Sequence, residues 1–355
     1  MHFMHSLKLA CAIAIMAALL PAGAAADDRA LCDRLGSPRD AAIQACSRIL
    51  AAGGLDAHET ASTLVSRGLH YWRNDREKAL ADINAAIELK PDLARAWWAR
   101  GYFNQSTHDL RKEPELRARI IADFNKAIEL DPSDVEVYYH RAGVYSNYEQ
   151  NHDRAIADYT TMIALDPTHR AARHARALSY GRKGDFELQL ADLSELVRLY
   201  PVRDSLVDRG MFYLARQDYD HAVTDLIEAR KLDPRHPSPL SGLAVASTAR
   251  GDYPQALALY EQAIRQAPHL MWLYRNRAET YLRMGEPDKA LDDAQRSFAV
   301  FRRDATALNQ RGRIYEALGR KEDAIADFRA ALALDQGTKP NADSRAGLRR
   351  LSAEP

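Results

Sequence analysis

The sequence predicts an all-α fold, a solenoid of antiparallel helix-turn-helix repeats. The first observation is a phrase that returns along the chain, such as IADFNKAIELDP at 121–132 and IADYTTMIALDP at 156–167. The residue before this phrase recurs at spacings of 41, 35, 34, 33, 34, 34 and 34 residues. A period of this length is typical of solenoids. These anchor residues are Ala79, Ile120, Ala155, Gln189, Ala222, Ala256, Ala290 and Ala324.

The second observation is that each repeat contains two helical patterns with a turn between them. After Ala222, the apolar residues Leu226 and Ala229 follow at i+4 and i+7, one face of a helix. A proline twelve residues after the anchor ends the second helix, because proline cannot continue one. Six repeats have it, as Pro91, Pro132, Pro167, Pro201, Pro234 and Pro268. Glycines such as Gly184, Gly251 and Gly319 mark the turn, where the first helix ends.

These residues resemble the tetratricopeptide repeat, a helix-turn-helix unit of 34 residues with small residues where its helices touch. One unit matches through Gly210, Tyr213, Ala222, Ala229 and Pro234, and another through Gly312, Tyr315, Ala324, Phe328 and Ala331. The resemblance covers eight units and implies a right-handed α-solenoid. Arg302 and Gln336 stand where the last two units lack the closing proline. An insertion at Ser106–Arg119 is either a longer polar turn or a partner-specific finger.

The ends of the chain differ from the repeats. Residues 1–26 have the charge, apolar run and Ala-x-Ala site of a signal peptide, with cleavage expected after Ala26. The alternative is an uncleaved N-terminal anchor, and no other segment is expected to span a membrane. We expect a capping hairpin at 27–58, the eight repeats at 59–338 and a polar cap or tail at 339–355. Export points to a bacterial periplasm.

Two cysteines, Cys32 and Cys46, follow the predicted cleavage point. In an exported protein an even count favours a disulfide. A bridge that closes a loop of this size stabilises by about 3 kcal/mol in the chain-entropy model. The alternative is two buried thiols that act as small apolar residues.

An arginine in each first helix accompanies an aspartate three residues past the anchor. Repeat six lacks both and carries Leu243 and Leu259 in their places. The joint loss predicts that each arginine pairs with the aspartate of its own repeat. The predicted pairs are Arg67–Asp82, Arg100–Asp123, Arg141–Asp158, Arg176–Asp192, Arg209–Asp225, Arg277–Asp293 and Arg311–Asp327. Near-identical sites in seven repeats favour a structural pair over a row of catalytic carboxylates.

The sequence gives no support for an enzyme. It lacks a Gly-rich phosphate loop, an His-Glu-x-x-His helix and a Gly-x-Ser-x-Gly elbow. We therefore expect no catalytic residues, no cofactor and no metal. The formal net charge is zero, whereas nucleic-acid-binding proteins typically carry an excess of basic residues, so we do not expect nucleic-acid binding.

A solenoid of helix pairs presents an extended concave surface, and in the resembled family this groove commonly holds a peptide or protein. We expect the groove side chains two positions before and after each arginine. They are Val65, Leu69, Trp98, Tyr102, Tyr139, His174, Leu178, Val207, Met211, Arg275, Glu279, Asn309 and Arg313. The predicted function is a non-enzymatic scaffold or adaptor for a protein or peptide, of unspecified oligomeric state. The alternative is a carbohydrate-binding or accessory module of a cell-envelope enzyme system, with Trp98 and Tyr102 stacked on sugar rings.

Overall fold

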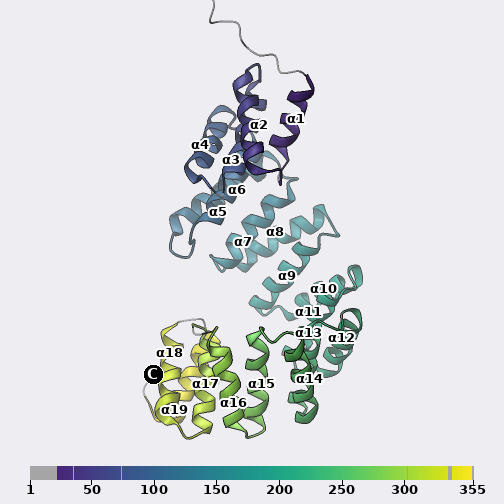
Figure 1. Cartoon of the computed structure of the whole chain (residues 1–355), viewed down its shortest axis with the longest axis vertical. Helices are drawn as coiled ribbons and strands as arrows, with labels where there is room; N and C mark the ends of the chain where they lie inside the picture. The colour runs from purple at the N-terminus through teal and green to yellow at the C-terminus, as the bar shows by residue number, and fades with distance from the viewer. Residues whose placement is uncertain (1–21, 35, 73, 302, 335–337, 354–355) are drawn as a thin grey trace, which may run out of the picture. The chain divides into compact units, whose positions relative to one another are not determined.

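The computed structural model describes residues 22–34, 36–72, 74–301, 303–334 and 338–353. All regular elements within these ranges are α-helices, labelled α1 to α19 in Figure 1. The chain divides into two compact units, unit 1 up to Gln189 and unit 2 from Leu190. Among the described helices, none has the length and apolar character needed to cross a membrane.

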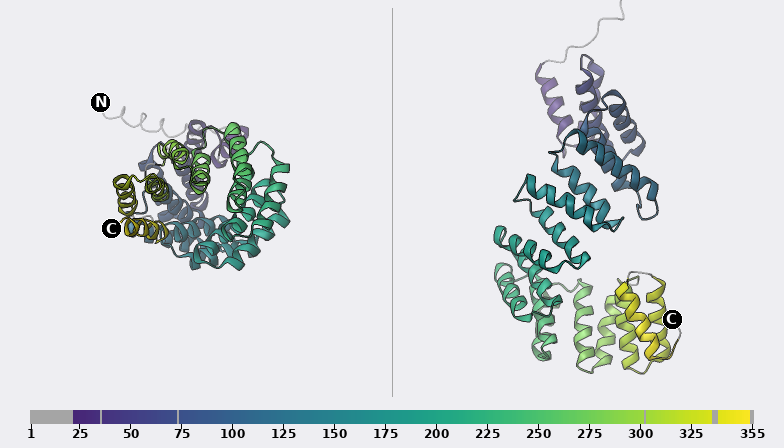
Figure 2. Two further views of the ribbon diagram at one scale, coloured as in Figure 1. Left: turned by 90° about the horizontal axis from the view of Figure 1, so that it is seen from below. Right: turned by 180° about the vertical axis from the view of Figure 1, so that it is seen from behind.

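Unit 1 is built from helix hairpins in which each first helix packs against the second helix that follows it. The paired helices α3 and α4, α5 and α6, and α7 and α8 contact each other, as do the first helices α3 and α5. Figure 2 shows these hairpins from two further sides. The helices are α1 (Ala22–Asp33), α2 (Arg39–Ala52), α3 (Ala57–Tyr71), α4 (Arg76–Leu89), α5 (Ala94–Thr107), α6 (Pro114–Leu130), α7 (Val135–Asn147), α8 (His152–Leu165) and α9 (Arg170–Lys183).

Unit 2 repeats the same arrangement. Helix α10 (Phe186–Leu199) runs across the division between the units. The pairs α11 and α12, α13 and α14, α15 and α16, and α17 and α18 pack together, and α19 covers α17 and α18. The remaining helices are α11 (Arg203–Ala215), α12 (Tyr219–Leu232), α13 (Pro237–Ala249), α14 (Tyr253–Gln266), α15 (Met271–Arg283), α16 (Pro287–Phe298), α17 (Ala305–Ala317), α18 (Lys321–Ala333) and α19 (Thr338–Arg350). The all-α solenoid predicted from the period is confirmed.

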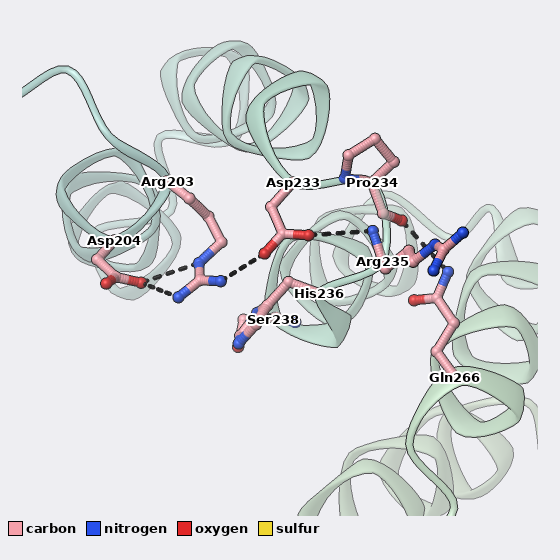
Figure 3. A network of polar contacts seen from close by, with 8 residues as sticks. All are labelled: Arg203, Asp204, Asp233, Pro234, Arg235, His236, Ser238 and Gln266. Atoms are coloured by element: carbon pink, nitrogen blue, oxygen red, sulfur yellow. Dashed lines mark hydrogen bonds and ion pairs between the residues drawn. The ribbon is translucent and has the colours of Figure 1, made fainter.

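The recurrent Asp-Pro after the second helices forms a hydrogen-bonded turn. At the end of α12 the Asp233 carboxylate accepts from the backbone N–H of Arg235 at 3.3 Å, as Figure 3 shows. Its other oxygen accepts from Arg203 Nη1 at 2.6 Å, so the start of α11 is tied to the end of α12. Hydrogen bonding to Arg203 lowers the pKa of Asp233. The turn therefore stops the helix through both the proline and the aspartate.

The small residue after each arginine lets the two helices of a hairpin approach closely. A Cβ on Gly101 would lie 2.7 Å from Cε1 of Phe124, and a Cβ on Gly312 would lie 2.8 Å from Cε1 of Phe328. Both phenylalanines are almost fully buried. Glycine is therefore needed at these positions to make room for an aromatic ring from the second helix.

Only part of the insertion at 106–119 forms the turn between the helices, because α5 ends at Thr107 and α6 already begins at Pro114. Leu110 is fully buried and packs in one cluster with Leu116 and Ile120. Arg117 Nη1 donates to the Leu110 carbonyl at 2.6 Å. The turn is therefore held in place by the buried Leu110 side chain and by the hydrogen bond to the Leu110 carbonyl, which differs from the expected polar turn.

The N-terminal hairpin α1–α2 is closed by a disulfide between Cys32 and Cys46, both fully buried. It is attached to α3 by several hydrogen bonds. Arg29 Nη1 donates to Thr63 Oγ1 at 2.9 Å, and the His70 Nε2–H donates to the Cys32 carbonyl at 2.8 Å. Most of the expected signal peptide lies outside the described residues, and α1 begins before the expected cleavage point.

Candidate functional site

The predicted pairs of arginine and aspartate lie within their own repeats. In each case the guanidinium Nε and Nη2 donate to the two oxygens of one carboxylate, with distances between 2.6 and 3.0 Å. The pairs are Arg67–Asp82, Arg100–Asp123, Arg141–Asp158, Arg209–Asp225, Arg277–Asp293 and Arg311–Asp327. All six aspartates are buried. Arg176 and Asp192 belong to different units, so the pairing predicted for them stays a prediction.

Repeat six fills the same place with apolar side chains. Leu243 is buried in a cluster with Leu226 and Ala246, and Leu259 packs against that cluster. The paired arginine and aspartate of the other repeats thus occupy a packing position between two helices. This geometry assigns them a structural role, because their donors and acceptors are used by each other.

In unit 1 these arginines also reach back to the preceding repeat. Arg100 Nη1 donates to Asn84 Oδ1 at 3.3 Å, and Arg141 Nη1 donates to Asn125 Oδ1 at 2.6 Å. Arg176 Nη1 donates to Thr160 Oγ1 at 3.1 Å. Each acceptor stands two residues after the aspartate of its repeat. Arg100 and Arg141, which also pair with the aspartates of their own repeats, therefore join their own second helix to the second helix before it.

An apolar depression of unit 1 lies on the first helices α3, α5 and α7, and we call it the aromatic pocket. Its volume is about 690 Å³. It is lined by Gly36, Ser37, Arg39, Leu69, His70, Trp72, Trp98, Tyr102, Glu136 and His140. A pocket of this size accommodates one or two side chains of a ligand. The turn between α1 and α2 supplies one wall, so the disulfide-closed hairpin is part of the pocket.

The aromatic rings of this pocket pack against one another. Trp98 and Tyr102 are stacked with ring centroids 5.2 Å apart and an interplanar angle of 5°. Trp72 and His140 approach the Tyr102 ring at 5.1 and 4.7 Å. Because Tyr102 is surrounded by rings, it has little open face for a flat ligand. The arrangement suits insertion of an apolar side chain better than stacking of a sugar ring.

A second depression lies between α7 and α9, and we call it the tyrosine pocket. It has a volume of about 230 Å³. It is lined by Tyr139, Ser146, Asn147, Tyr159, Ala171, His174, Ala175, Leu178, Ser179 and Arg182. Three of the predicted groove residues are thus brought together here, and Tyr139 and Leu178 are exposed.

In unit 2 the predicted charged end of the groove is a polar pocket of about 600 Å³ between α15, α17 and α19. Arg275, Glu279, Asn309 and Arg313 all line it. Arg313 Nη2 lies 3.1 Å from Glu279 Oε1, so these opposite charges are paired. Val207 is half-buried against the cluster around Leu226, whereas Met211 is exposed.

Three predicted groove residues are not open surface. Val65 and Leu69 are buried in the core cluster of α3, α4 and α5, although Leu69 still borders the aromatic pocket. Asn309 is only 4% exposed, and its Oδ1 accepts from Ser344 Oγ of α19 at 2.6 Å. Expecting them on an open surface was wrong, because the packing of α3 against α4 and α5 buries Val65 and Leu69, and α19 covers Asn309.

The sequence analysis missed several pocket residues because its spacing rule considered only two positions per helix. Trp72 and the turn Gly36–Arg39 lie outside the helical register used for that rule. His140 and Glu136 precede Arg141 by one and five positions. The signal that could have found them is the density of aromatic residues and histidine in repeats one to three.

His140 provides a prediction about pH. Burial beside Phe124 and Tyr102 lowers the pKa of His140, while the Glu136 carboxylate at 3.9 Å acts in the opposite direction. A depressed pKa in the folded state gives stability that is present above 6.5 and lost as the pH falls through the folded-state value. We expect the melting temperature to fall more for the wild type than for His140→Gln when the pH is lowered from about 7.5 to about 5, that is, from above to below histidine's usual pKa. Identical pH profiles would contradict this assignment.

Within the described ranges, no group of three or more His, Cys, Asp or Glu side chains is placed to hold a metal ion. The first helices thus line the aromatic and tyrosine pockets in unit 1 and the polar pocket in unit 2.

Comparisons with known proteins place these features in context. The tetratricopeptide repeat profile matches residues 235–303 and 269–337. The chain is 25% identical over 295 residues to the DnaJ homolog subfamily C member 7 homolog of Schizosaccharomyces pombe, covering 78% of this chain and 56% of the relative. It is 28% identical over 200 residues to DnaJ homolog subfamily C member 3 of Gallus gallus, covering 52% and 40%. The chain therefore spans about half the length of these curated relatives.

Among solved structures, the human IFIT1 dimer with m7Gppp-AAAA superposes with a TM-score of 0.54 at 14% identity. The superposition covers 88% of this chain and 77% of that chain. At this identity the likeness concerns the fold alone.

Proposed function

This chain is a tetratricopeptide-repeat protein, and on that premise we propose that it is a non-enzymatic scaffold that holds an extended peptide segment of another protein. The observation that carries the proposal is the pair of neighbouring pockets on the first helices of unit 1. They are the aromatic pocket of about 690 Å³ and the tyrosine pocket of about 230 Å³. Aromatic side chains in such a position are enriched at protein interfaces.

The proposal includes export to an oxidising compartment, with the bacterial periplasm as the location. Two features support it. Residues 1–26 read as a signal peptide, and the buried bridge between Cys32 and Cys46 is of a kind that persists outside the reducing cytosol.

Carbohydrate binding is the second function considered, and the geometry of the aromatic pocket favours it less. Stacking on a sugar needs an open aromatic face. Tyr102 has Trp98 parallel to it and both Trp72 and His140 beside it. A peptide side chain can instead enter the cavity between these rings and the turn before α2.

The test is selection of binders from a random peptide library with the oxidised full chain. We expect enriched peptides that lose affinity when Ser37→Trp fills the aromatic pocket from its rim. Trp98→Ala should weaken binding as well, but Trp98 also packs against the core, so its folding must be checked by circular dichroism.

The matched control is Leu89→Ala with Leu165→Ala. These leucines are 44% and 45% exposed at the ends of second helices and do not line either pocket. Failure to enrich any peptide would overturn the proposal, as would equal loss of binding in the control.

A further inference from the structure

The tyrosine pocket has a one-sided charge. Of its lining side chains, Arg182 and His174 are basic, and none carries a carboxylate. Burial raises the pKa of the Tyr159 phenol to about 12, so this hydroxyl stays neutral. Arg182 therefore supplies a positive charge among the described side chains that line this pocket.

The Arg182 guanidinium is held by neutral partners. Its Nη1 donates to Ser146 Oγ at 2.8 Å and to Asn147 Oδ1 at 3.4 Å. Neighbouring Lys183 differs, since its ammonium pairs with Asp153 at 2.7 Å and with Asp185 at 3.1 Å. A guanidinium presents five N–H donors, and its strongest partners are carboxylates. The fixed guanidinium of Arg182 thus retains donors suited to an anionic group from a ligand.

The two pockets lie on either side of α7. His140 lines the aromatic pocket, and the adjacent residue Tyr139 lines the tyrosine pocket. An α-helix with its side chains is about 10–12 Å across. An extended peptide advances about 3.3 Å per residue, so it crosses α7 in about three or four residues.

We propose that unit 1 binds an extended segment that places a bulky apolar side chain in the aromatic pocket and an aspartate or glutamate side chain, three or four positions away, beside Arg182. This inference rests on the proposed function and names the chemistry of its partner. The charge of the tyrosine pocket selects the acid, and the aromatic walls select the apolar residue.

The experiment uses peptides enriched in the selection described above, amidated at the C-terminus to remove the terminal carboxylate. We expect them to share an aromatic or large aliphatic residue and an acid at this spacing. Changing that acid to its amide should weaken binding about tenfold, the size of one charge-assisted hydrogen bond. Binding is measured by fluorescence anisotropy.

Variants of Arg182 then connect the acid to the site. In Arg182→Gln the acid and amide peptides should bind alike, whereas Arg182→Lys should keep most of the preference because it keeps the charge. In Ser37→Trp both peptides should weaken by the same factor, which separates the two pockets.

Three results would overturn the inference. One is a set of enriched peptides without an acid at this spacing, and another is an acid preference that survives in Arg182→Gln. The third is binding that depends on a free C-terminus. In each case peptide binding itself, and with it the proposed function, would stand. A selection that enriches no peptide would overturn both.

Discussion

Asp293→Leu is expected to lower the free energy of unfolding of unit 2 by about 3 kcal/mol, the lower end of the range for breaking a buried ion pair. Asp293 is buried, and both of its oxygens accept from Arg277, at 2.7 and 2.9 Å. Without the carboxylate, the Arg277 guanidinium would remain between α15 and α16 without its bidentate partner, beside the Tyr274 and Tyr281 rings, each 5.7 Å away.

The double variant Arg277→Leu with Asp293→Leu should return to within about 1 kcal/mol of the wild type, because replacing both partners of a buried pair is often neutral. In repeat six, Leu243 and Leu259 already occupy the positions that the arginine and the aspartate have in the other repeats. The measurement is amide hydrogen exchange of α15 and α16 together with the urea midpoint, since repeat arrays open locally.

The neighbouring Asp292→Leu is the matched control for charge and hydrophobicity, because Asp292 is exposed. We expect it to change stability by less than about 0.5 kcal/mol. A double variant as unstable as Asp293→Leu alone would show that the pair is needed for more than filling its place.

Reduction of the disulfide is expected to destabilise the α1–α2 hairpin by about 3 kcal/mol, the chain-entropy value for a short loop. Cys32 and Cys46 are separated by 14 residues. The reduced hairpin keeps the ion pair between Asp28 and Arg48 and the hydrogen bond from Arg29 to Thr63. We therefore expect faster hydrogen exchange in α1 and α2 while α5 to α8 keep their protection.

The same reduction should weaken peptide binding, because Gly36 and Ser37 of this hairpin line the aromatic pocket. The variant Cys32→Ser with Cys46→Ser serves as the comparison, since it lacks the bridge with or without reductant. The expectation fails if hydrogen exchange in α1 and α2 is unchanged by reductant in the wild type.

Much of the fold follows from the sequence because the same local rules recur in every repeat. Proline after the second helices and glycine in the turns, such as Gly184 and Gly251 at positive φ, locate the helix ends. The within-repeat partners of the arginines could also be inferred, because repeat six loses both members together. These are features whose physical cause lies within one repeat.

The pockets were less predictable because they depend on neighbours from different repeats. Val65 appeared available at a groove position, but core packing buries it. Trp72 borders the aromatic pocket from the C-cap of α3, a place that helical periodicity does not describe. The partners of Arg182 depend on the packing of α9 beside α7, which no local pattern encodes.

The backward hydrogen bonds of Arg100 and Arg141 have a consequence for how such an array can grow. In the α5–α6 repeat, Arg100 of the first helix donates to the preceding repeat, and Asn125 of the second helix accepts from Arg141 of the following repeat. A tandem copy of this repeat would therefore present matching donors and acceptors at both new junctions. Repeat six has Leu243 in place of the arginine, so a copy of it placed after α5–α6 would leave the Asn125 amide without this donor. The repeats thus differ in their junction chemistry, which restricts the orders in which duplication can rebuild the chain.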